Sequence, residues 1–202
     1  MRVERAAGTP RVRWRNGGGW TRELVRSPAA GDALADGSFG DGFDWRVSVA
    51  DVEADGPFSA FDGYDRLLVL LDGEGMDLHF TETGHTARLR AGNRRARFRG
   101  ESPIHATLVD GPTTDFNLIW RRDQSLGVAR LMGPADEVGV GGGDGAVAGL
   151  FVVSGGASGP GGETCAAGDC VIGAPGERLQ VSLAGTAVVF LVAPVVGAAP
   201  PA

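Results

Sequence analysis

Short apolar runs separated by glycine-rich turns recur along the whole chain, and they limit its possible folds more than any other feature. The clearest runs cover residues 45–50, 67–71 and 114–120. In the first run, Trp45, Val47 and Val49 alternate with Arg46 and Ser48, which is the period of a strand with two different faces. Helical periodicity is nearly absent, and the 34 glycines and 11 prolines supply many turns. The sequence therefore predicts an all-β protein built from short strands.

The second half of the chain weakly repeats the plan of the first. An apolar run ends in a glycine turn at residues 67–73 and again at 150–156, and each half closes with an apolar run, at 104–109 and 187–193. Between these, Ala-Gly-Asn at 91–93 corresponds to Ala-Gly-Asp at 167–169. Such a repeat is typical of duplicated barrels. We therefore expect an N-terminal half at 1–132, a Gly-rich loop or insertion at 133–148, a C-terminal half at 149–194 and a loose tail at 195–202.

Charge and the ends of the chain narrow the range of partners. The formal net charge is −6, and this excess of acid disfavours nucleic acid and anionic membranes as partners. The basic N-terminus is not followed by the apolar segment of a signal peptide, and the apolar stretch near the C-terminus is too short to span a bilayer. We expect a cytoplasmic protein with neither nucleic-acid nor membrane partners.

Residues 14–23, WRNGGGWTRE, form the most unusual segment. Three consecutive glycines allow positive φ and a close approach of the backbone to a ligand. A phosphate-binding loop of the Walker type is excluded, because its lysine is missing and no helical pattern follows. Two interpretations stay open at this point: a tight turn before an edge strand, or a ligand-binding loop with a dense polar cluster.

This segment closely resembles the signature W-K-N-G-G-G-x-T-R-E of the HutD/Ves family. Further matches to the family follow in the same order along the chain, and the resemblance covers roughly residues 1–125. They are FDWRVS at 43–48, DGPFS at 55–59, FDGYDR at 61–66, LDGEGM at 71–76 and DFNL at 115–118. Arg15 stands where the family usually has lysine, which keeps the charge but changes its geometry.

The resemblance implies a bicupin, with two cupin-like double-stranded β-helix (jelly-roll) barrels in one compact chain. It also implies a link to histidine utilisation, in which members bind a small pathway acid such as a formylated or formiminated glutamate and moderate the pathway. The Gly-rich stretch near residue 140 leaves the alignment of the second half with the family open.

Several polar residues are candidates for binding such an acid. The guanidinium groups of Arg22 and Arg46 match a carboxylate in shape and charge. The backbone N–H groups of residues 17–19 are candidates for an anion nest, and Glu23 with Asp115 and Asn117 for recognition of an amino or formimino group. The complete predicted ligand site is Asn16, Gly17, Gly18, Gly19, Thr21, Arg22, Glu23, Arg46, Ser48, Asp115 and Asn117.

The sequence contains fewer candidate residues for metal binding or catalysis than for binding a small acid. The three histidines, His79, His85 and His105, do not form the H-x-H pair that places two imidazoles on one strand face, so we expect no metal and no cofactor. No nucleophile motif is present, and catalytic residues are not predicted. Two alternatives stay open. One is a cupin-type isomerase or hydrolase with Glu23 or His85 as base. The other is a regulatory interaction through the arginine-rich residues 88–99. Exposed strand edges make a homodimer possible.

Overall fold

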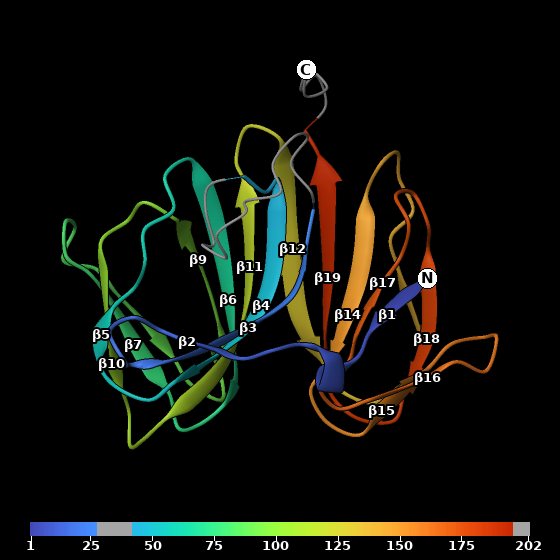
Figure 1. The fold of residues 1–202 in the computed structure, drawn as a ribbon, viewed down its shortest axis with the longest axis horizontal. Coiled ribbons are helices and arrows are strands. Elements are labelled where there is room, and N and C mark those ends of the chain that lie inside the picture. The colour runs from blue at the N-terminus through green and yellow to red at the C-terminus, as the bar shows by residue number, and fades with distance from the viewer. Residues whose placement is uncertain (28–41, 196–202) are drawn as a thin grey trace. The chain divides into compact units, whose positions relative to one another are not determined.

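The computed structural model describes residues 1–27 and 42–195, and they form an almost entirely β protein (Figure 1). The chain divides into two compact units. We call residues Arg11–Leu126 the large unit, and Met1–Pro10 together with Gly127–Pro194 the small unit. Antiparallel strands make up both units, which confirms the all-β prediction. Within the described ranges, no helix has the length and the apolar character needed to cross a membrane.

The large unit consists of a six-stranded and a four-stranded sheet. The six-stranded sheet has the order β2 (Val12–Arg13), β3 (Gly19–Arg26), β4 (Trp45–Val52), β11 (Thr113–Arg121), β6 (Tyr64–Asp72) and β9 (Arg95–Arg99). The four-stranded sheet has the order β5 (Gly56–Pro57), β10 (Ile104–Leu108), β7 (Met76–Phe80) and β8 (Thr86–Leu89). Fully buried apolar side chains from both sheets, among them Leu68, Leu70, Met76, Leu78 and Leu89, form one core cluster.

The register of the three central strands places several polar side chains on one face of the six-stranded sheet. Asn117 of β11 lies opposite Ser48 of β4, and Ile119 lies opposite both Arg46 and Arg66. Because side chains alternate along a strand, all five of these residues point to the same face. Polar and charged groups therefore share that face with apolar core residues.

The small unit also consists of two sheets. The first has the order β1 (Arg2–Glu4), β17 (Cys170–Ile172), β14 (Val147–Val152), β19 (Ala187–Pro194) and β12 (Ser125–Met132). The second has the order β13 (Ala135–Val140), β18 (Leu179–Leu183), β15 (Gly156–Ser158) and β16 (Thr164–Ala166). Aliphatic side chains such as Leu150, Val181 and Val189 form its core. The strands of this unit are mostly short, and Val, Leu and Ala make up most of its core.

The main predicted strands are confirmed. The runs at 45–50, 67–71, 104–109, 114–120, 150–153 and 187–193 lie in β4, β6, β10, β11, β14 and β19. Residues 28–41 and 196–202 lie outside the described residues, and almost all of the predicted tail at 195–202 falls there.

Two predicted segments differ from the structure. The sequence predicts a loop at residues 133–148, but strand β13 occupies Ala135–Val140, where buried Val138 pairs with Val181 of β18. Residues 1–10 belong to the predicted N-terminal half, yet they group with the small unit. Their strand β1 pairs with β17, and Arg5 forms an ion pair of 2.8 Å with Asp169. Pairing over such a sequence separation leaves no trace in local periodicity.

Candidate functional site

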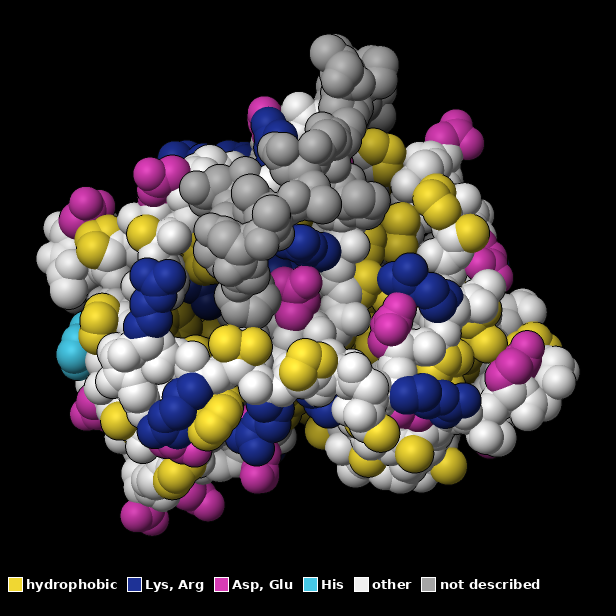
Figure 2. Space-filling model, viewed as in Figure 1, with side chains coloured by type: hydrophobic (Ala, Val, Ile, Leu, Met, Phe, Trp, Pro, Cys, Tyr) yellow, Lys and Arg dark blue, Asp and Glu magenta, His cyan; other side chains and the backbone are white. Residues whose placement is uncertain are grey.

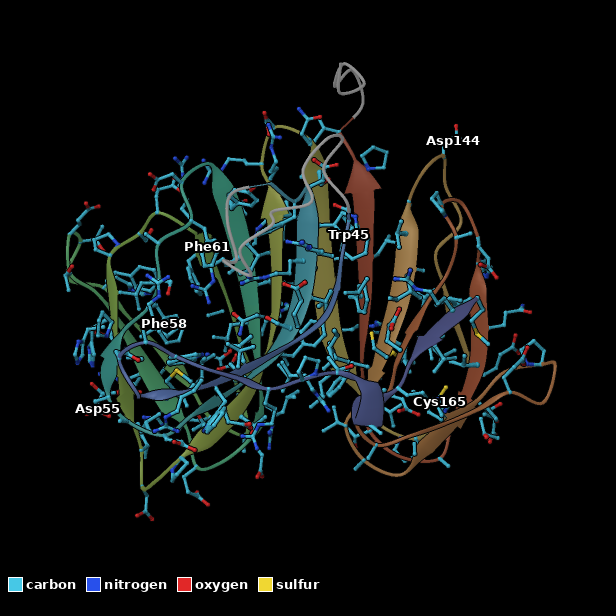
Figure 3. The ribbon with its side chains drawn as sticks, viewed as in Figure 1. Trp45, Asp55, Phe58, Phe61, Asp144 and Cys165 are labelled. Carbon is cyan, nitrogen blue, oxygen red and sulfur yellow. The ribbon has the colours of Figure 1, made fainter. Side chains whose placement is uncertain are left out.

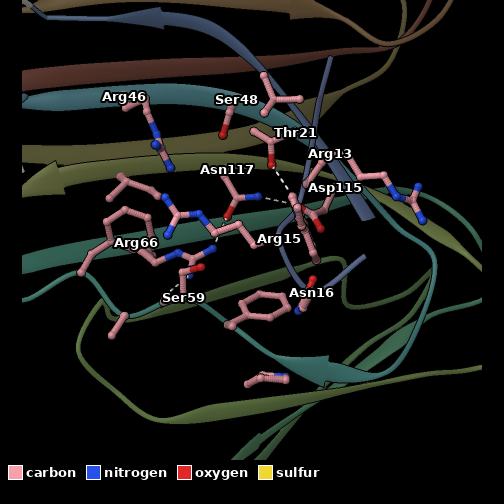
Figure 4. Close-up of a pocket in the computed structure, with 18 residues that line it drawn as sticks. Arg13, Arg15, Asn16, Thr21, Arg46, Ser48, Ser59, Arg66, Asp115 and Asn117 are labelled. Atoms are coloured by element: carbon pink, nitrogen blue, oxygen red, sulfur yellow. Dashed lines mark hydrogen bonds between the residues drawn. The ribbon is translucent and has the colours of Figure 1, made fainter. Parts of the chain in front are cut away.

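The large unit contains a pocket of about 680 Å³ above the polar face of its six-stranded sheet (Figure 4). This is an ordinary volume for a small-molecule site. Phe58 and Phe61, from the segment that follows β5, contribute aromatic rings to its lining (Figure 3). The full lining is Val12, Arg13, Trp14, Arg15, Asn16, Thr21, Arg46, Ser48, Ala50, Pro57, Phe58, Ser59, Ala60, Phe61, Arg66, Asp115, Asn117 and Ile119.

Charge is unevenly distributed in this lining, which includes four arginines and one acid. Arg13 and Arg15 are exposed, whereas Arg46 and Arg66 are each only 7% exposed. The single acid, Asp115, is 1% exposed. A buried guanidinium is costly unless it is hydrogen-bonded or paired with an anion. The lining therefore favours a negatively charged guest.

The Arg66 guanidinium makes two hydrogen bonds and contacts aromatic rings, but one of its N–H donors has no partner among the described residues. Its Nη1 donates to the backbone oxygen of Ser59 at 3.3 Å, and its Nη2 donates to Asn117 Oδ1 at 2.8 Å. The guanidinium carbon lies 5.1 Å from the ring centroid of Phe58 and 5.4 Å from that of Phe61. Its Nε is buried and has no hydrogen-bond partner among the described residues. Arg66 is thus rigidly placed and still able to donate to a ligand.

Asp115 continues the same hydrogen-bond chain. Asn117 Nδ2 donates to Asp115 Oδ1, while Asp115 Oδ2 is buried without a hydrogen-bond partner in the described parts of the chain. Burial raises the pKa of Asp115 to about 7, against the opposing effects of Arg66 and of the Asn117 hydrogen bond. Burial also lowers the pKa of Arg66 to about 10, which leaves it charged at neutral pH. Arg66 is therefore a permanent cation in the same hydrogen-bond chain as Asp115, an acid that titrates near neutral pH.

Arg46 is the second buried cation of the lining. Its guanidinium carbon lies 5.1 Å from the ring centroids of both Phe43 and Phe61. Glu23 Oε2 is 4.0 Å from Arg46 Nη1, and Glu23 also lies 3.6 Å from Arg26. Burial lowers the pKa of Arg46, and Glu23 opposes that shift. Because Phe61 contacts both Arg46 and Arg66, the two guanidinium groups converge around one ring.

The WRNGGGWTRE segment forms a hairpin that supplies one wall of the pocket. Trp14 N donates to the oxygen of Gly19 at 3.0 Å, and Trp14 Nε1 donates to Thr21 Oγ1 at 2.7 Å (Figure 4). Gly17 has a φ of 73°, which favours glycine. A Cβ at Gly19 would overlap the carbonyl oxygen of Asp51 on β4. The glycines thus allow the turn and its close docking against β4.

The predicted anion nest at residues 17–19 is not what this hairpin forms. The Gly17 N–H donates to the oxygen of Trp14 at 3.0 Å, and the Gly18 N–H donates to Asn16 Oδ1 at 3.0 Å. Both groups therefore close the turn and are not directed at a guest. The structure supports the other interpretation of the segment, a tight turn before a strand, with the added role of a pocket wall.

The structure brings six of the eleven predicted site residues to the pocket. They are Asn16, Thr21, Arg46, Ser48, Asp115 and Asn117. Gly17, Gly18, Gly19, Arg22 and Glu23 do not line it. Arg22 pairs with Val49 and so lies on the opposite face of the sheet from Thr21 and Ser48. Glu23 acts on the site through its proximity to Arg46.

Arg66 is the most important residue that the sequence analysis missed. A signal for it was present, because Arg66 is in phase with Leu68 and Leu70, which a buried strand directs to its core face. A charged residue at such a position is unusual and indicates a partner or a ligand. Ser59, Phe58 and Phe61 were also missed, since they lie in an irregular segment that has no periodicity to read.

The histidines lie outside the pocket lining. His79 lies opposite His105 across β7 and β10, and His79 Nδ1 is hydrogen-bonded to Thr86 Oγ1 at 3.0 Å. His85 packs against Phe80 with ring centroids 5.6 Å apart. Within the part of the chain that the structure describes, no group of three or more His, Cys, Asp or Glu side chains is arranged to hold a metal ion.

The arginine-rich residues 88–99 lie mostly on an outer surface. Arg95, Arg97 and Arg99 are exposed on β9, while Ala96 and Phe98 are buried, as the alternation predicts. Acidic neighbours accompany several of these arginines, including Asp65 at 3.1 Å from Arg97 and Asp77 at 2.6 Å from Arg90. The surface formed by residues 88–99 is therefore largely charge-balanced. Basic and acidic side chains are also interspersed on the face of the molecule that Figure 2 shows.

The antiparallel β architecture is that of a cupin-fold protein. Two solved structures with 10% sequence identity support the fold alone. YhhW from Escherichia coli has a TM-score of 0.65, and the match covers 100% of this chain and 98% of YhhW. Ylba from E. coli has a TM-score of 0.67, and the match covers 95% of this chain and 90% of Ylba. The sequence pattern of the HutD family matches residues 6–191. The chain belongs to the HutD family.

Individual relatives agree with this assignment. An uncharacterised 21.2 kDa protein in the hutC 3′ region of Pseudomonas putida is 40% identical over 120 residues, which is 59% of this chain and 58% of that protein. Protein Ves of Cronobacter sakazakii is 34% identical over 58% of this chain and 59% of its own length. The chain thus matches little more than half the length of these relatives.

Solved structures of the family cover nearly the whole chain. The conserved protein PA5104 of Pseudomonas aeruginosa PAO1 is 34% identical, with a TM-score of 0.77 over 95% of this chain and 96% of that one. HutD from Pseudomonas fluorescens SBW25, in a formate condition, is 29% identical, with a TM-score of 0.77 over 96% and 98%. Membership of this family associates the chain with histidine utilisation.

Proposed function

We propose that the chain binds a small carboxylic acid of histidine breakdown in the pocket of the large unit. The observation that carries this proposal is the convergence of two buried guanidinium groups, Arg46 and Arg66, with the Arg66 Nε free of protein partners among the described residues. Arginine binds carboxylates through charge-assisted, often bidentate hydrogen bonds. A bound carboxylate would offset the cost of keeping both cations out of water.

A formylated or formiminated glutamate fits the chemistry of this lining. One carboxylate lies between the guanidinium groups, and the N–H of the formyl or formimino group donates to Asp115 Oδ2. The rings of Phe58 and Phe61 then cover the aliphatic stem of the ligand. Exposed Arg15 lies at the pocket and is available to the second carboxylate. The ligand therefore meets a complementary group at each of its ends.

Binding is better supported than catalysis. Neither Glu23 nor His85, the two candidate general bases, lines the pocket. A general base has to lie within hydrogen-bond reach of the proton that it removes, directly or through one water. Partner binding through residues 88–99 is also less favoured, because several arginines there already have acidic neighbours.

Thermal unfolding against a panel of pathway acids tests the proposal. The panel is urocanate, formiminoglutamate, N-formylglutamate, glutamate and histidine, with the diamide of N-formylglutamate as the matched ligand that lacks carboxylates. A ligand at about 100 times its Kd adds about 2.7 kcal/mol of stability, or roughly 5 to 10 °C in Tm for a chain of this length. We expect at least one acid to raise the Tm and the diamide to leave it unchanged. A Tm that no acid raises contradicts the proposal.

A further inference from the structure

A hydrogen-bond chain along the pocket floor ends in two unsatisfied atoms. The Ser59 oxygen accepts from Arg66, Arg66 donates to Asn117, and Asn117 donates to Asp115 (Figure 4). Arg66 Nε and Asp115 Oδ2 are left without hydrogen-bond partners among the described residues, and both are buried. The first atom always donates. The second accepts when Asp115 is ionised and donates when it is protonated.

The charged groups around Asp115 do not fix its protonation state by themselves. Arg46 on β4 and Arg13 and Arg15 in the hairpin wall line the same pocket. Arg66 on β6 and the hydrogen bond from Asn117 favour the ionised form of Asp115. Burial opposes them, and Asp51 of β4 acts in the same direction as burial. No charged side chain from β5, β7, β8 or β10 is among the described residues that line the pocket. The balance places the pKa of Asp115 at about 7, so both forms are accessible near neutral pH.

We propose that Asp115 determines ligand specificity through its protonation state. An acid that lacks an N–H donor beside its carboxylate binds together with one proton, whereas an acid that carries such an N–H binds to ionised Asp115. This inference rests on the proposed carboxylate binding and adds the rule by which the same pocket discriminates between acids.

The physical reason lies in the unpartnered Oδ2. Without an N–H on the ligand, ionised Asp115 would face a carboxylate as a second buried anion, which is strongly unfavourable. Protonation removes that charge and turns Oδ2–H into a donor to the ligand, and Arg66 Nε is a second unpartnered donor on a residue of the same pocket lining. A ligand N–H instead satisfies the ionised Oδ2 directly, and no proton is needed.

N-formylglycine and N-formylsarcosine provide a matched pair of probes, because they differ only in the replacement of the amide N–H by N–CH₃. We measure the Kd of each by calorimetry at about pH 5.5, 7 and 8.5, on both sides of the Asp115 pKa. N-formylsarcosine is expected to bind up to about 10-fold more weakly for each pH unit above 7, with uptake of about one proton. The Kd of N-formylglycine is expected to change by less than about 3-fold between about pH 7 and 8.5. Below pH 7 it is expected to rise by up to about 10-fold per pH unit, because Asp115 must then lose a proton to bind this probe.

The variant Asp115→Asn is the matched control, since it keeps a neutral group with a donor at this position at every pH. In this variant the Kd of N-formylsarcosine is expected not to depend on pH. Proton uptake by the unmodified protein, from titrations in two buffers of different ionisation enthalpy, is a readout that does not depend on the variant. A Kd for N-formylsarcosine that does not change with pH, with no proton uptake, overturns the inference alone. Absence of binding by both probes at every pH overturns the proposed function, and the inference with it.

Discussion

The variant Arg66→Met is expected to bind N-formylglutamate at least about 30-fold more weakly than the unmodified protein. Removing one partner of a buried charge-assisted contact costs about 2 to 5 kcal/mol, which corresponds to roughly 30-fold to several thousand-fold in affinity. Methionine retains apolar contact with Phe58 and Phe61, so the wall of the pocket is preserved. Calorimetric titration gives the two Kd values, and circular dichroism checks that the variant folds.

The matched control for this prediction is Arg22→Met. It removes the same charge from the same sheet, but Arg22 lies on the face opposite the pocket. Its Kd is expected to stay within about 3-fold of the unmodified protein, because only long-range charge effects reach the ligand. Equal losses in the two variants would show that the total charge of the sheet, and not the Arg66 contact, determines binding.

The variant Asp115→Asn is expected to be more stable than the unmodified protein at about pH 8 and equally stable at about pH 3.5. The introduced amide oxygen can still accept from Asn117, and the substitution removes the cost of ionising a fully buried carboxyl. The pKa of Asp115 in the folded chain, about 7, lies above the unfolded value near 4. The folded chain therefore binds more protons between these values, and stability falls as the pH rises through that range.

The size of this effect follows from the same shift. A difference of about 3 pKa units corresponds to at most about 4 kcal/mol, which the variant recovers at high pH. For a chain of this length that is roughly 8 to 16 °C in Tm at most, measured by calorimetry of the ligand-free protein at both pH values. A variant that is less stable than the unmodified protein at both pH values would mean that Asp115 is ionised and well paired in the folded state.

Strand periodicity was sufficient to predict part of the site. Arg46 and Ser48 share one face of a run whose other face is apolar, and the structure places both in the pocket. The choice of Arg22 failed for the same geometrical reason, since it is out of phase with Thr21 on β3. Proximity in sequence to the WRNGGGWTRE motif is therefore a weaker guide to the pocket than the alternation of the strand.

The remaining features depend on contacts that local sequence does not encode. Arg66 joins the site because β6 pairs with β11 in a register that sets Arg66 opposite Ile119. The hairpin N–H groups are used within the turn, which depends on the hydrogen bonds of Asn16 and Trp14. Strand β13 forms because Val138 reaches the core of the small unit, although glycines follow it closely. Each of these outcomes follows from packing or pairing between distant segments.

A crystal structure of the protein with N-formylglutamate bound tests the central claim most directly. The account predicts a ligand carboxylate between Arg46 and Arg66, with oxygen atoms about 2.7 to 3.0 Å from guanidinium nitrogens, one of them Arg66 Nε. It also predicts that the formyl N–H points to Asp115 Oδ2. A ligand bound elsewhere, or one whose carboxylates both point away from these two arginines, would contradict it.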